Sequence, residues 1–328
     1  MALPVWFEAT TISLLVLVLV ADLVVVSRRP HVPSHREAAL WVAGYVGLAL
    51  VFAVVMWLVA GPDPATEFAA GWLTEYSLSV DNLFVFVIIM ARFTVPRELQ
   101  QTALMVGIVV ALVLRGVFIL LGAELISRFS WIFYAFGFFL VYTAVTLVRD
   151  HVRGEDEDYE ENVVIRKVRR LLRVTPDFEG NRLRVERDGR RLWTPLVIVF
   201  LALGTTDVLF ALDSIPAVFG LTRSAFIVFT ANLFALMGLR QLYFLLGGLL
   251  RRLVYLSLGL AVVLAFIGVK LVLSAVHENT LPFVNGGQPV EAVPEIPIWL
   301  SLTAIAGVLV VATAASLLRT RRLARSEA

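Results

Sequence analysis

The chain has 328 residues, of which 59% are hydrophobic and 16% are charged, and its mean hydropathy is +0.86. Soluble domains carry about 25% charged residues, so this composition excludes an ordinary water-soluble protein. The net charge of +2 and the placement of the Lys and Arg residues between apolar segments exclude the basic patch of a nucleic-acid-binding protein. The absence of Cys excludes disulfides and thiolate metal sites.

Apolar segments long enough to cross a bilayer follow one another along the whole chain. We therefore expect an all-α polytopic membrane protein, with one transmembrane domain over 1–328, because the alternating ten-residue segments of a β-barrel are absent. The nine predicted helices cover residues 6–27, 38–60, 70–91, 102–123, 130–149, 195–219, 224–248, 253–275 and 297–318.

The loops between these helices alternate in their content of Lys and Arg. Every odd-numbered loop is richer in basic residues than the even-numbered loops beside it, and the C-terminal tail is also basic. Because basic loops stay in the cytoplasm, we expect the N-terminus outside and the C-terminus inside.

The fifth loop, 150–194, is the only sizeable segment between spans. It begins with the acidic run "RGEDEDYEEN" and continues with the basic run "VVIRKVRRLLRV". The basic run has apolar residues at helical spacing, which predicts either a solvated connector with a short helix or a helix on the inner membrane surface. This cytoplasmic charged loop could dock a cytoplasmic or membrane partner.

Two stretches of the chain align without a gap. "EYSLSVDN" (75–82) lies over "DVLFALDS" (207–214), and the helix after each carries a similar string, "LRGVFILLG" and "LRQLYFLLG". This pattern predicts duplication of a three-helix unit, spans 3–5 and 6–8. Three is odd, so the copies have opposite orientations. Such inverted repeats are typical of transporters whose substrate site lies near the midplane.

Carboxylates lie inside the predicted spans of both copies. They are Glu75, Asp81, Asp207 and Asp213. Two arginines deep in spans, Arg115 and Arg240, serve as counter-charges or gates. Asp22 and Lys270 would cancel each other, so the remaining charge is −4 + 2 = −2. This charge suits one divalent cation, and protonation of two acids would balance it equally well.

The oxygen-rich residues of the two copies suit a hard cation such as Mn²⁺, Ca²⁺ or Mg²⁺. The candidate ligands are Asp81, Asp213, Asn82 and Ser214, helped by Glu75, Asp207 or water. The alternative is buried ion pairing that only fixes helix packing. Asn82 and Asn232 could also act only as hydrogen-bonding contacts between helices, and Asp22 is either a mouth residue or a snorkelling structural acid.

The six-residue spacing of the acids places them 120° short of two full turns, so each pair does not share one helix face. Either each pair serves two levels of a path, or the helix is unwound between its acids. Pro216 and the weak helix former "GTT" favour unwinding in the sixth span. In the third span, Ser77 and Ser79 could bond back to carbonyls and bend the helix.

The strings "EYSLSVDNLFVF", "TTDVLFALDSIPAVFGLT" and "NLFALMGLRQLYFLL" closely resemble the TerC family of integral membrane proteins, from about Asp22 to about Val276. The resemblance implies a bacterial plasma membrane, manganese efflux or tellurium resistance, and metal-site roles for the aligned residues. Those residues are Glu75, Asp81, Asn82, Asp207, Asp213 and Ser214. One departure is Gly204, where many members of the family place a Glu.

We therefore expect a transporter that exports Mn²⁺, in preference to Ca²⁺ or Mg²⁺, in exchange for protons and without an organic cofactor. The direction of transport is implied by the resemblance alone. The alternative is a non-transporting scaffold of a tellurite or metal stress-resistance complex, with 150–194 as its docking surface. An enzyme is not expected, because no nucleophile–base pair or His lies at membrane depth.

Overall fold

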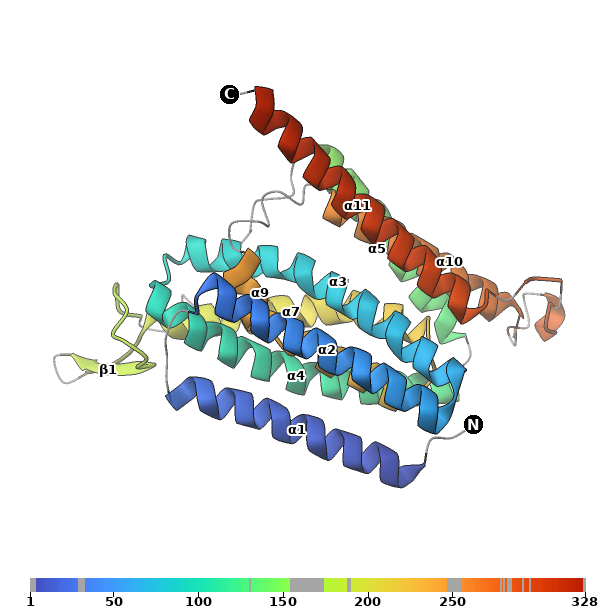
Figure 1. Cartoon of the computed structure of the whole chain (residues 1–328), viewed down its shortest axis with the longest axis horizontal. Helices are drawn as coiled ribbons and strands as arrows, with labels where there is room; N and C mark the ends of the chain where they lie inside the picture. Colours follow the sequence, from blue (N-terminus) through green and yellow to red (C-terminus); the bar gives the residue numbers. More distant parts are fainter. Residues whose placement is uncertain are drawn as a thin grey trace.

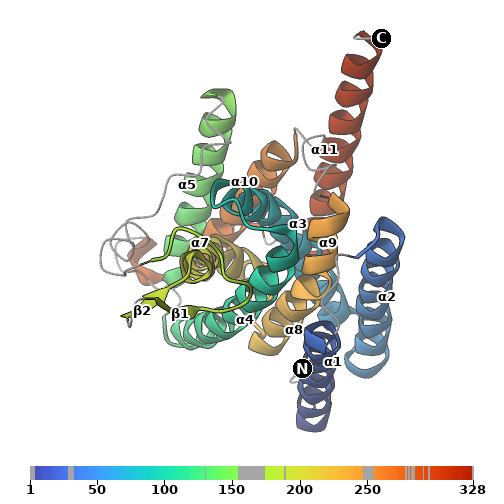
Figure 2. The same cartoon turned by 90° about the vertical axis from the view of Figure 1, so that its left-hand side faces the viewer.

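A computed structural model describes residues 4–28, 33–129, 131–153, 174–187, 190–246, 255–277, 279, 281, 285–290, 292–294 and 296–326. The helices are α1 (Val5–Arg28), α2 (His35–Ala60), α3 (Pro62–Arg92), α4 (Arg97–Arg128), α5 (Ile132–Arg153), α7 (Pro195–Phe219), α8 (Ala225–Leu236), α9 (Leu239–Leu246), α10 (Leu256–His277) and α11 (Ile298–Ser326), with a short 3₁₀ turn at Asn285–Gly287. In the described ranges, nine stretches are long and apolar enough to span a membrane, which confirms the predicted all-α polytopic fold. Successive long helices cross the bundle in opposite directions (Figures 1 and 2).

The third helix is longer than expected. The string "GPDPATEF" was predicted to be a loop, but only Gly61 connects α2 to α3. Gly61 has φ 95°, a conformation that favours glycine. Pro62 then begins α3, where a proline fits because the first helical N–H has no partner within the helix. This early start places Glu67 inside α3, in the part of the chain that was predicted to lie in a loop.

The seventh predicted span, 224–248, is broken and is not one helix. Met237 is extended (φ −62°, ψ 127°), and Gly238 has φ 81°. The break therefore separates α8 from α9. The predicted unwinding of the sixth span is wrong, because α7 runs without interruption from Pro195 to Phe219. Pro216 lies in the last turn of α7, where the loss of one hydrogen bond does not open the helix.

Helix α3 lies in the middle of the bundle and packs against α2, α7, α8 and α11. The most extensive packing joins α5 to α10, followed by α3 with α8 and α4 with α7. Exchanging α3 with α7, α4 with α8 and α5 with α10 reproduces this set of pairs. The pairing therefore agrees with the inverted repeat, which stays a prediction.

Close helix contact between α5 and α10 depends on two glycines. A Cβ at Gly137 would lie 2.6 Å from Val272 Cγ2 and 2.8 Å from the Gly268 carbonyl oxygen. A Cβ at Gly268 would likewise lie 2.8 Å from the Gly137 carbonyl oxygen. Small residues at such crossings let the two backbones approach and gain dispersion contacts, which is the main attraction between helices in lipid.

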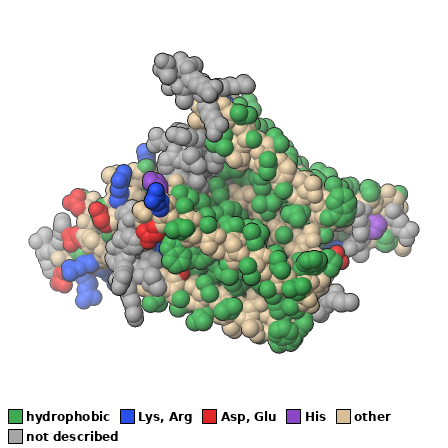
Figure 3. Space-filling model, in the orientation of Figure 1, with side chains coloured by type: hydrophobic (Ala, Val, Ile, Leu, Met, Phe, Trp, Pro, Cys, Tyr) green, Lys and Arg blue, Asp and Glu red, His purple; other side chains and the backbone are tan. Residues whose placement is uncertain are grey.

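A β-hairpin lies at the end of the bundle where α3 ends and α7 begins (Figure 1). Its antiparallel strands are β1 (Arg184–Arg187) and β2 (Arg190–Trp193). The sequence did not predict it, and the predicted helix over "VVIRKVRRLLR" lies outside the described residues. Figure 3 shows charged side chains gathered over this end and hydrophobic ones over the broad face, as expected for a chain embedded in lipid.

Candidate functional site

The centre of the bundle holds a buried charge cluster made by three helices. Arg115 of α4 is 1% exposed and donates from Nη1 to Glu75 Oε2 of α3 at 2.8 Å. The same guanidinium faces Asp207 of α7, with Nε 3.3 Å from Oδ2 and Nη2 3.2 Å from Oδ1. Arg115 therefore bridges the two acids that the sequence alignment places at the same position of the two copies. The cluster has one positive and two negative groups, and we call it the central triad.

Polar side chains extend along the same faces of α3 and α7. Ser79 and Asn82 follow Glu75 by four and seven residues, and Ser214 follows Asp207 by seven, spacings that share one helix face. All three side chains are buried. Helices α3 and α7 pack against each other, and these oxygen groups continue along the face of Glu75 on α3 and of Asp207 on α7.

Several buried polar atoms in this region have no hydrogen-bond partner in the described part of the chain. They are Glu75 Oε1, Ser79 Oγ, Ser214 Oγ, Asn232 Nδ2 and Trp72 Nε1. An unpaired buried polar group costs about 1–3 kcal/mol, and a charged one more, so natural proteins retain such groups where a ligand, water or proton meets them. Three of these five atoms are oxygens on α3 and α7.

The second acid of each pair does not join the central triad. Asp213 is partly buried and lies close enough to Arg115 and Glu75 to interact with them electrostatically. Asp81 lies in α3, but its side chain is outside what the structure describes. Both α3 and α7 are continuous, which rules out an unwound helix between the acids. The explanation that remains for the six-residue spacing is that the two acids of each pair lie at two separate levels. Ser77 does bond back to the Leu73 carbonyl at 2.7 Å, as predicted, whereas Ser79 does not.

Arg240 does not neutralise the acids of the repeat. Its Nη2 lies 3.2 and 3.4 Å from the two carboxylate oxygens of Asp22, near the far end of α1. Lys270 does not cancel Asp22 either, because its Nζ donates to Ser301 Oγ at 3.1 Å and its charge is attracted to Glu67. Glu67 in turn accepts a hydrogen bond from Thr222. The buried charges thus form three separate groups: Glu67 with Lys270, the central triad, and Asp22 with Arg240.

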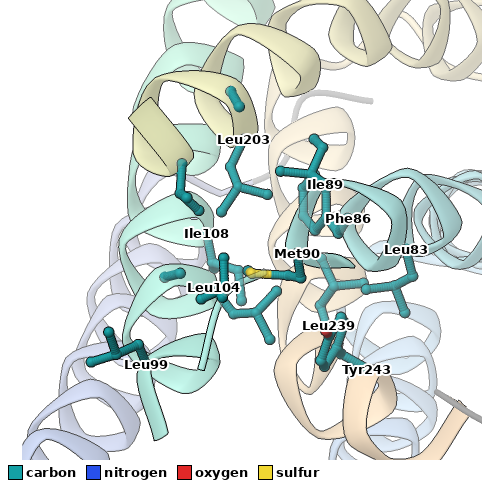
Figure 4. Close-up of a cluster of buried hydrophobic side chains, with 14 of the residues drawn as sticks. Leu83, Phe86, Ile89, Met90, Leu99, Leu104, Ile108, Leu203, Leu239 and Tyr243 are labelled. Atoms are coloured by element: carbon teal, nitrogen blue, oxygen red, sulfur yellow. The ribbon is translucent and has the colours of Figure 1, made fainter. Parts of the chain in front are cut away.

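Packed apolar side chains close the bundle near the central triad. One cluster joins α3, α4, α7 and α9 toward the hairpin end (Figure 4), where Leu83, Phe86, Met90 and Leu104 are buried. A second cluster, which includes Ile119, Ile215 and Phe219, lies near the opposite ends of α4 and α7. With Glu75 at 0% and Asp207 at 3% exposed, the central triad is closed to water from both ends.

The residue at position 204 lies in the contact between α7 and α4. Gly204 is buried, and a Cβ there would lie 3.2 Å from Val110 Cγ1. The glycine lets α4 approach α7 about one turn before Asp207. A Glu at this position would require Val110 to move.

Residues 60–324 match the Integral membrane protein TerC family. The chain belongs to the TerC family. It is 48% identical to the uncharacterized membrane protein Rv2723 of Mycobacterium tuberculosis over 93% of this chain and 77% of that protein. It is 40% identical to the uncharacterized membrane protein STKORF319 of Myxococcus xanthus, over 97% of this chain and 93% of that protein. It is 38% identical to a protein of Escherichia coli K12 with the proposed name membrane-bound redox modulator Alx, over 90% of this chain and 88% of that protein. No solved structure matches the chain.

The described side chains do not form a ready-made metal site: among them, no group of three or more His, Asp or Glu side chains could hold a metal ion. Two carboxylates do converge at the central triad, but Arg115 fills the space between them. The set of six predicted ligands stays a prediction, because Asp81 is outside the described side chains. The sequence analysis did not predict that Ser79 and Glu67 belong to the polar groups inside the bundle. Four-residue spacing from Glu75 could have indicated Ser79.

Proposed function

We propose that this protein is a transporter of a hard divalent cation, Mn²⁺ in the first place, and that the central triad is the binding level near the membrane midplane. The observation that carries the proposal is Glu75, which is fully buried and has one carboxylate oxygen that no described donor reaches. A buried charge of this kind is functional by default in a membrane protein. The unpaired oxygens of Ser79 and Ser214 add hard ligands of the type that Mn²⁺ accepts.

The charge of the triad explains how metal and protons could exchange. Glu75, Asp207 and Arg115 sum to −2 + 1 = −1. A divalent cation that binds the carboxylates displaces the guanidinium from between them, since both are positive and compete for the same oxygens. Protonation of Glu75 would compensate the unpaired oxygen when the metal has left. Such competition between metal and proton for one carboxylate supports proton exchange.

The two apolar clusters around the triad support alternating access. Each closes one route from the triad to one end of the bundle. A cation bound between them is released on one side only when one cluster separates while the other stays packed. On the orientation predicted from the basic loops, the hairpin end would face the cytoplasm, and the N-terminus and the start of α3 would face outward. Export would then run from the hairpin end outward.

The test compares manganese content in cells that express the parent chain or its variants under a manganese challenge. We expect the parent to lower cell manganese and the variants Glu75→Gln and Asp207→Asn to lose this effect. Glu124→Gln is the matched control, because Glu124 lies on the surface of α4 with its side chain 58% exposed. If both central variants insert into the membrane and still lower cell manganese as the parent does, the transport proposal is wrong. A protein that protects cells without changing their metal content would instead act as a scaffold.

A further inference from the structure

The Glu67–Lys270 group lies at the end of the bundle away from the hairpin, which we call the outer end after the predicted orientation. Glu67 of α3 accepts a hydrogen bond from the hydroxyl of Thr222, in the turn between α7 and α8. Thr222 is buried, and its hydroxyl oxygen accepts the Ser224 N–H at 3.2 Å. The hydroxyl proton is therefore directed to Glu67, and this carboxylate ties α3 to the turn.

Lys270 of α10 supplies the positive charge of the group. It is 8% exposed, and Nζ donates to Ser301 Oγ of α11 at 3.1 Å. The charges of Lys270 and Glu67 attract each other, although no hydrogen bond joins them in the described part of the chain. A buried ammonium depends on an opposite charge nearby, so Lys270 draws α10 toward α3 for as long as Glu67 is ionised.

Two further charged side chains lie at the outer end. Asp63, one turn before Glu67 on α3, is exposed and carries the same charge as Glu67. Arg223 follows Thr222 in the turn, and its guanidinium carbon lies 4.9 Å from the centre of the Phe133 ring of α5. Among the described side chains, Lys270 is therefore the cation that the charge of Glu67 attracts.

The turn that Glu67 holds is packed tightly between α4 and α10. A Cβ at Gly220 would lie 2.6 Å from Ile267 Cγ2 of α10. A Cβ at Gly122 of α4 would lie 2.9 Å from Cε2 of the Phe219 ring. Phe219 belongs to the apolar cluster that closes the central triad on this side. Movement of the turn would therefore unpack that cluster.

Glu67 lies on the outer side of the apolar cluster, and Glu75 lies on its inner side. The two acids are eight residues apart on α3, or about 12 Å along the helix at 1.5 Å per residue. Gly71 lies halfway between them, where a Cβ would be 3.1 Å from Val218 Cγ1 of the cluster. Glu67 is partly exposed, whereas Glu75 is 0% exposed. A proton from the outer end therefore reaches Glu67 without passing the cluster.

We propose that Glu67 is a proton-binding residue of the exchange, and that it latches the outer end of the transporter while it is ionised. The inference rests on the proposed transport function. A proton from the water at the outer end binds one carboxylate oxygen of Glu67, and the group becomes neutral. The attraction to Lys270 is then lost, and the hydrogen bond from Thr222 falls to about half its strength, since bonds to an ionised acceptor are roughly twice as strong as neutral ones.

The turn between α7 and α8 can then separate from α3, and the apolar cluster opens toward the outer end. Acid at this end therefore favours the state that releases the cation there. Protons that exchange for the cation enter from the same side, so the latch opens where the exchange needs it.

The test uses the absence of Cys from the chain, because a single introduced Cys then reports the opening of one end. Val218 and Val199 are both 0% exposed and both lie on α7. Val218 belongs to the outer cluster and Val199 to the cluster toward the hairpin. The purified full-length chain with Val218→Cys or Val199→Cys is reacted in detergent with a charged methanethiosulfonate reagent, and the rate of labelling is measured.

We expect Glu67→Gln to raise the labelling rate of Val218→Cys by about tenfold, as weakening of a hydrogen bond to a charged group predicts, and to leave Val199→Cys unchanged. Thr222→Val should act in the same direction. Asp63→Asn is the matched control, because it removes an exposed carboxylate one turn away on the same helix. Lowering the pH should raise the ratio of the two labelling rates in the parent and not in Glu67→Gln; this ratio cancels the effect of pH on the thiols.

The latch is wrong if Glu67→Gln labels at Val218→Cys as slowly as the parent, or if both ends label faster together, which would be a general loosening. Titration with MnCl₂, with free Mn²⁺ counted by its paramagnetic resonance signal, keeps this failure apart from that of the proposed function. Glu67→Gln should bind Mn²⁺ as the parent does, because the central triad is intact. If Glu67→Gln opens the outer end but the parent binds no Mn²⁺, the latch stands and the proposed function fails.

Discussion

The central triad makes a sharp prediction about stability, because Arg115 holds two buried carboxylates at once. Replacing it by methionine keeps an unbranched apolar stem and removes the charge. Glu75 and Asp207, at 0% and 3% exposed, then lie next to each other without a counter-charge. Removal of one partner of a buried ion pair costs about 3–5 kcal/mol, and here one removal leaves two acids unpaired.

Thermal unfolding of the purified chain in detergent measures this cost. For a chain of this size, 1 kcal/mol corresponds to about 2 °C, so Arg115→Met should lower Tm by about 6–10 °C. Arg128→Met is the matched control on the same helix. Arg128 pairs with Glu124 on the surface, where the side chains are 69% and 58% exposed, and exposed pairs contribute at most about 1 kcal/mol.

The rescue separates lost charge balance from lost packing. The triple variant Glu75→Gln, Arg115→Met, Asp207→Asn has no charge left in the triad, and neutral replacement of a buried ion cluster is often tolerated. Its Tm should therefore return most of the way to that of the parent. The reasoning fails if Arg115→Met costs no more than Arg128→Met, or if the neutral triple variant unfolds as early as the single one.

Three further predictions test the break, the helix crossing and the unpaired oxygens. Gly238→Ala should cost about 1–2 kcal/mol in the free energy of unfolding, because a Cβ is strained at φ 81° and meets Tyr45. Gly307→Ala in α11, where a Cβ would have nothing within 4 Å, should be neutral or stabilising. Equal effects would contradict the conclusion that the break requires glycine at position 238. Gly268→Ala should lower Tm because its Cβ would lie 2.8 Å from the Gly137 carbonyl oxygen, while Gly44→Ala, in open space, should not; an unchanged Tm would mean that α5 and α10 do not cross at these glycines. Ser214→Ala should leave Tm equal or higher, since it removes a buried hydroxyl that has no partner among the described residues. It should also weaken Mn²⁺ binding when the purified chain is titrated with MnCl₂; a loss of stability would show that the hydroxyl is already satisfied.

The sequence predicts the spans well because lipid demands long apolar helices, and their composition is visible without tertiary information. The boundaries were less accurate. The prolines of "GPDPATEF" suggested a loop, yet Pro62 begins α3. Unwinding at α7, which contains Pro216, was one of two explanations of the acid spacing, and the break lies instead at Gly238. A proline in the last turn costs one hydrogen bond, whereas a glycine at positive φ changes the direction of the chain.

The sequence identified the buried acids of the candidate site, but not the side chains with which they pair. The alignment places Glu75 over Asp207, and the structure brings both to one arginine, but the sequence cannot say which arginine reaches them. Arg115 bridges both, and Arg240 pairs with Asp22, 218 residues away. Ser79 was considered only as a helix-bending residue, although it lies on the face of Glu75. Pairing across helices depends on their rotation about their axes, which a single sequence does not contain.

The positions of the charges suggest why one arginine holds both acids. On the proposed mechanism, α3 and α7 must separate on one side at a time, and the bridge of Arg115 from Glu75 to Asp207 resists this separation. A divalent cation between the carboxylates can replace the contact without leaving either acid unpaired. The empty transporter is then held closed by its own guanidinium, and a cation that takes its place makes movement less costly. A ligand shifts such an equilibrium only by its differential affinity for the two states, and competition with Arg115 supplies that difference.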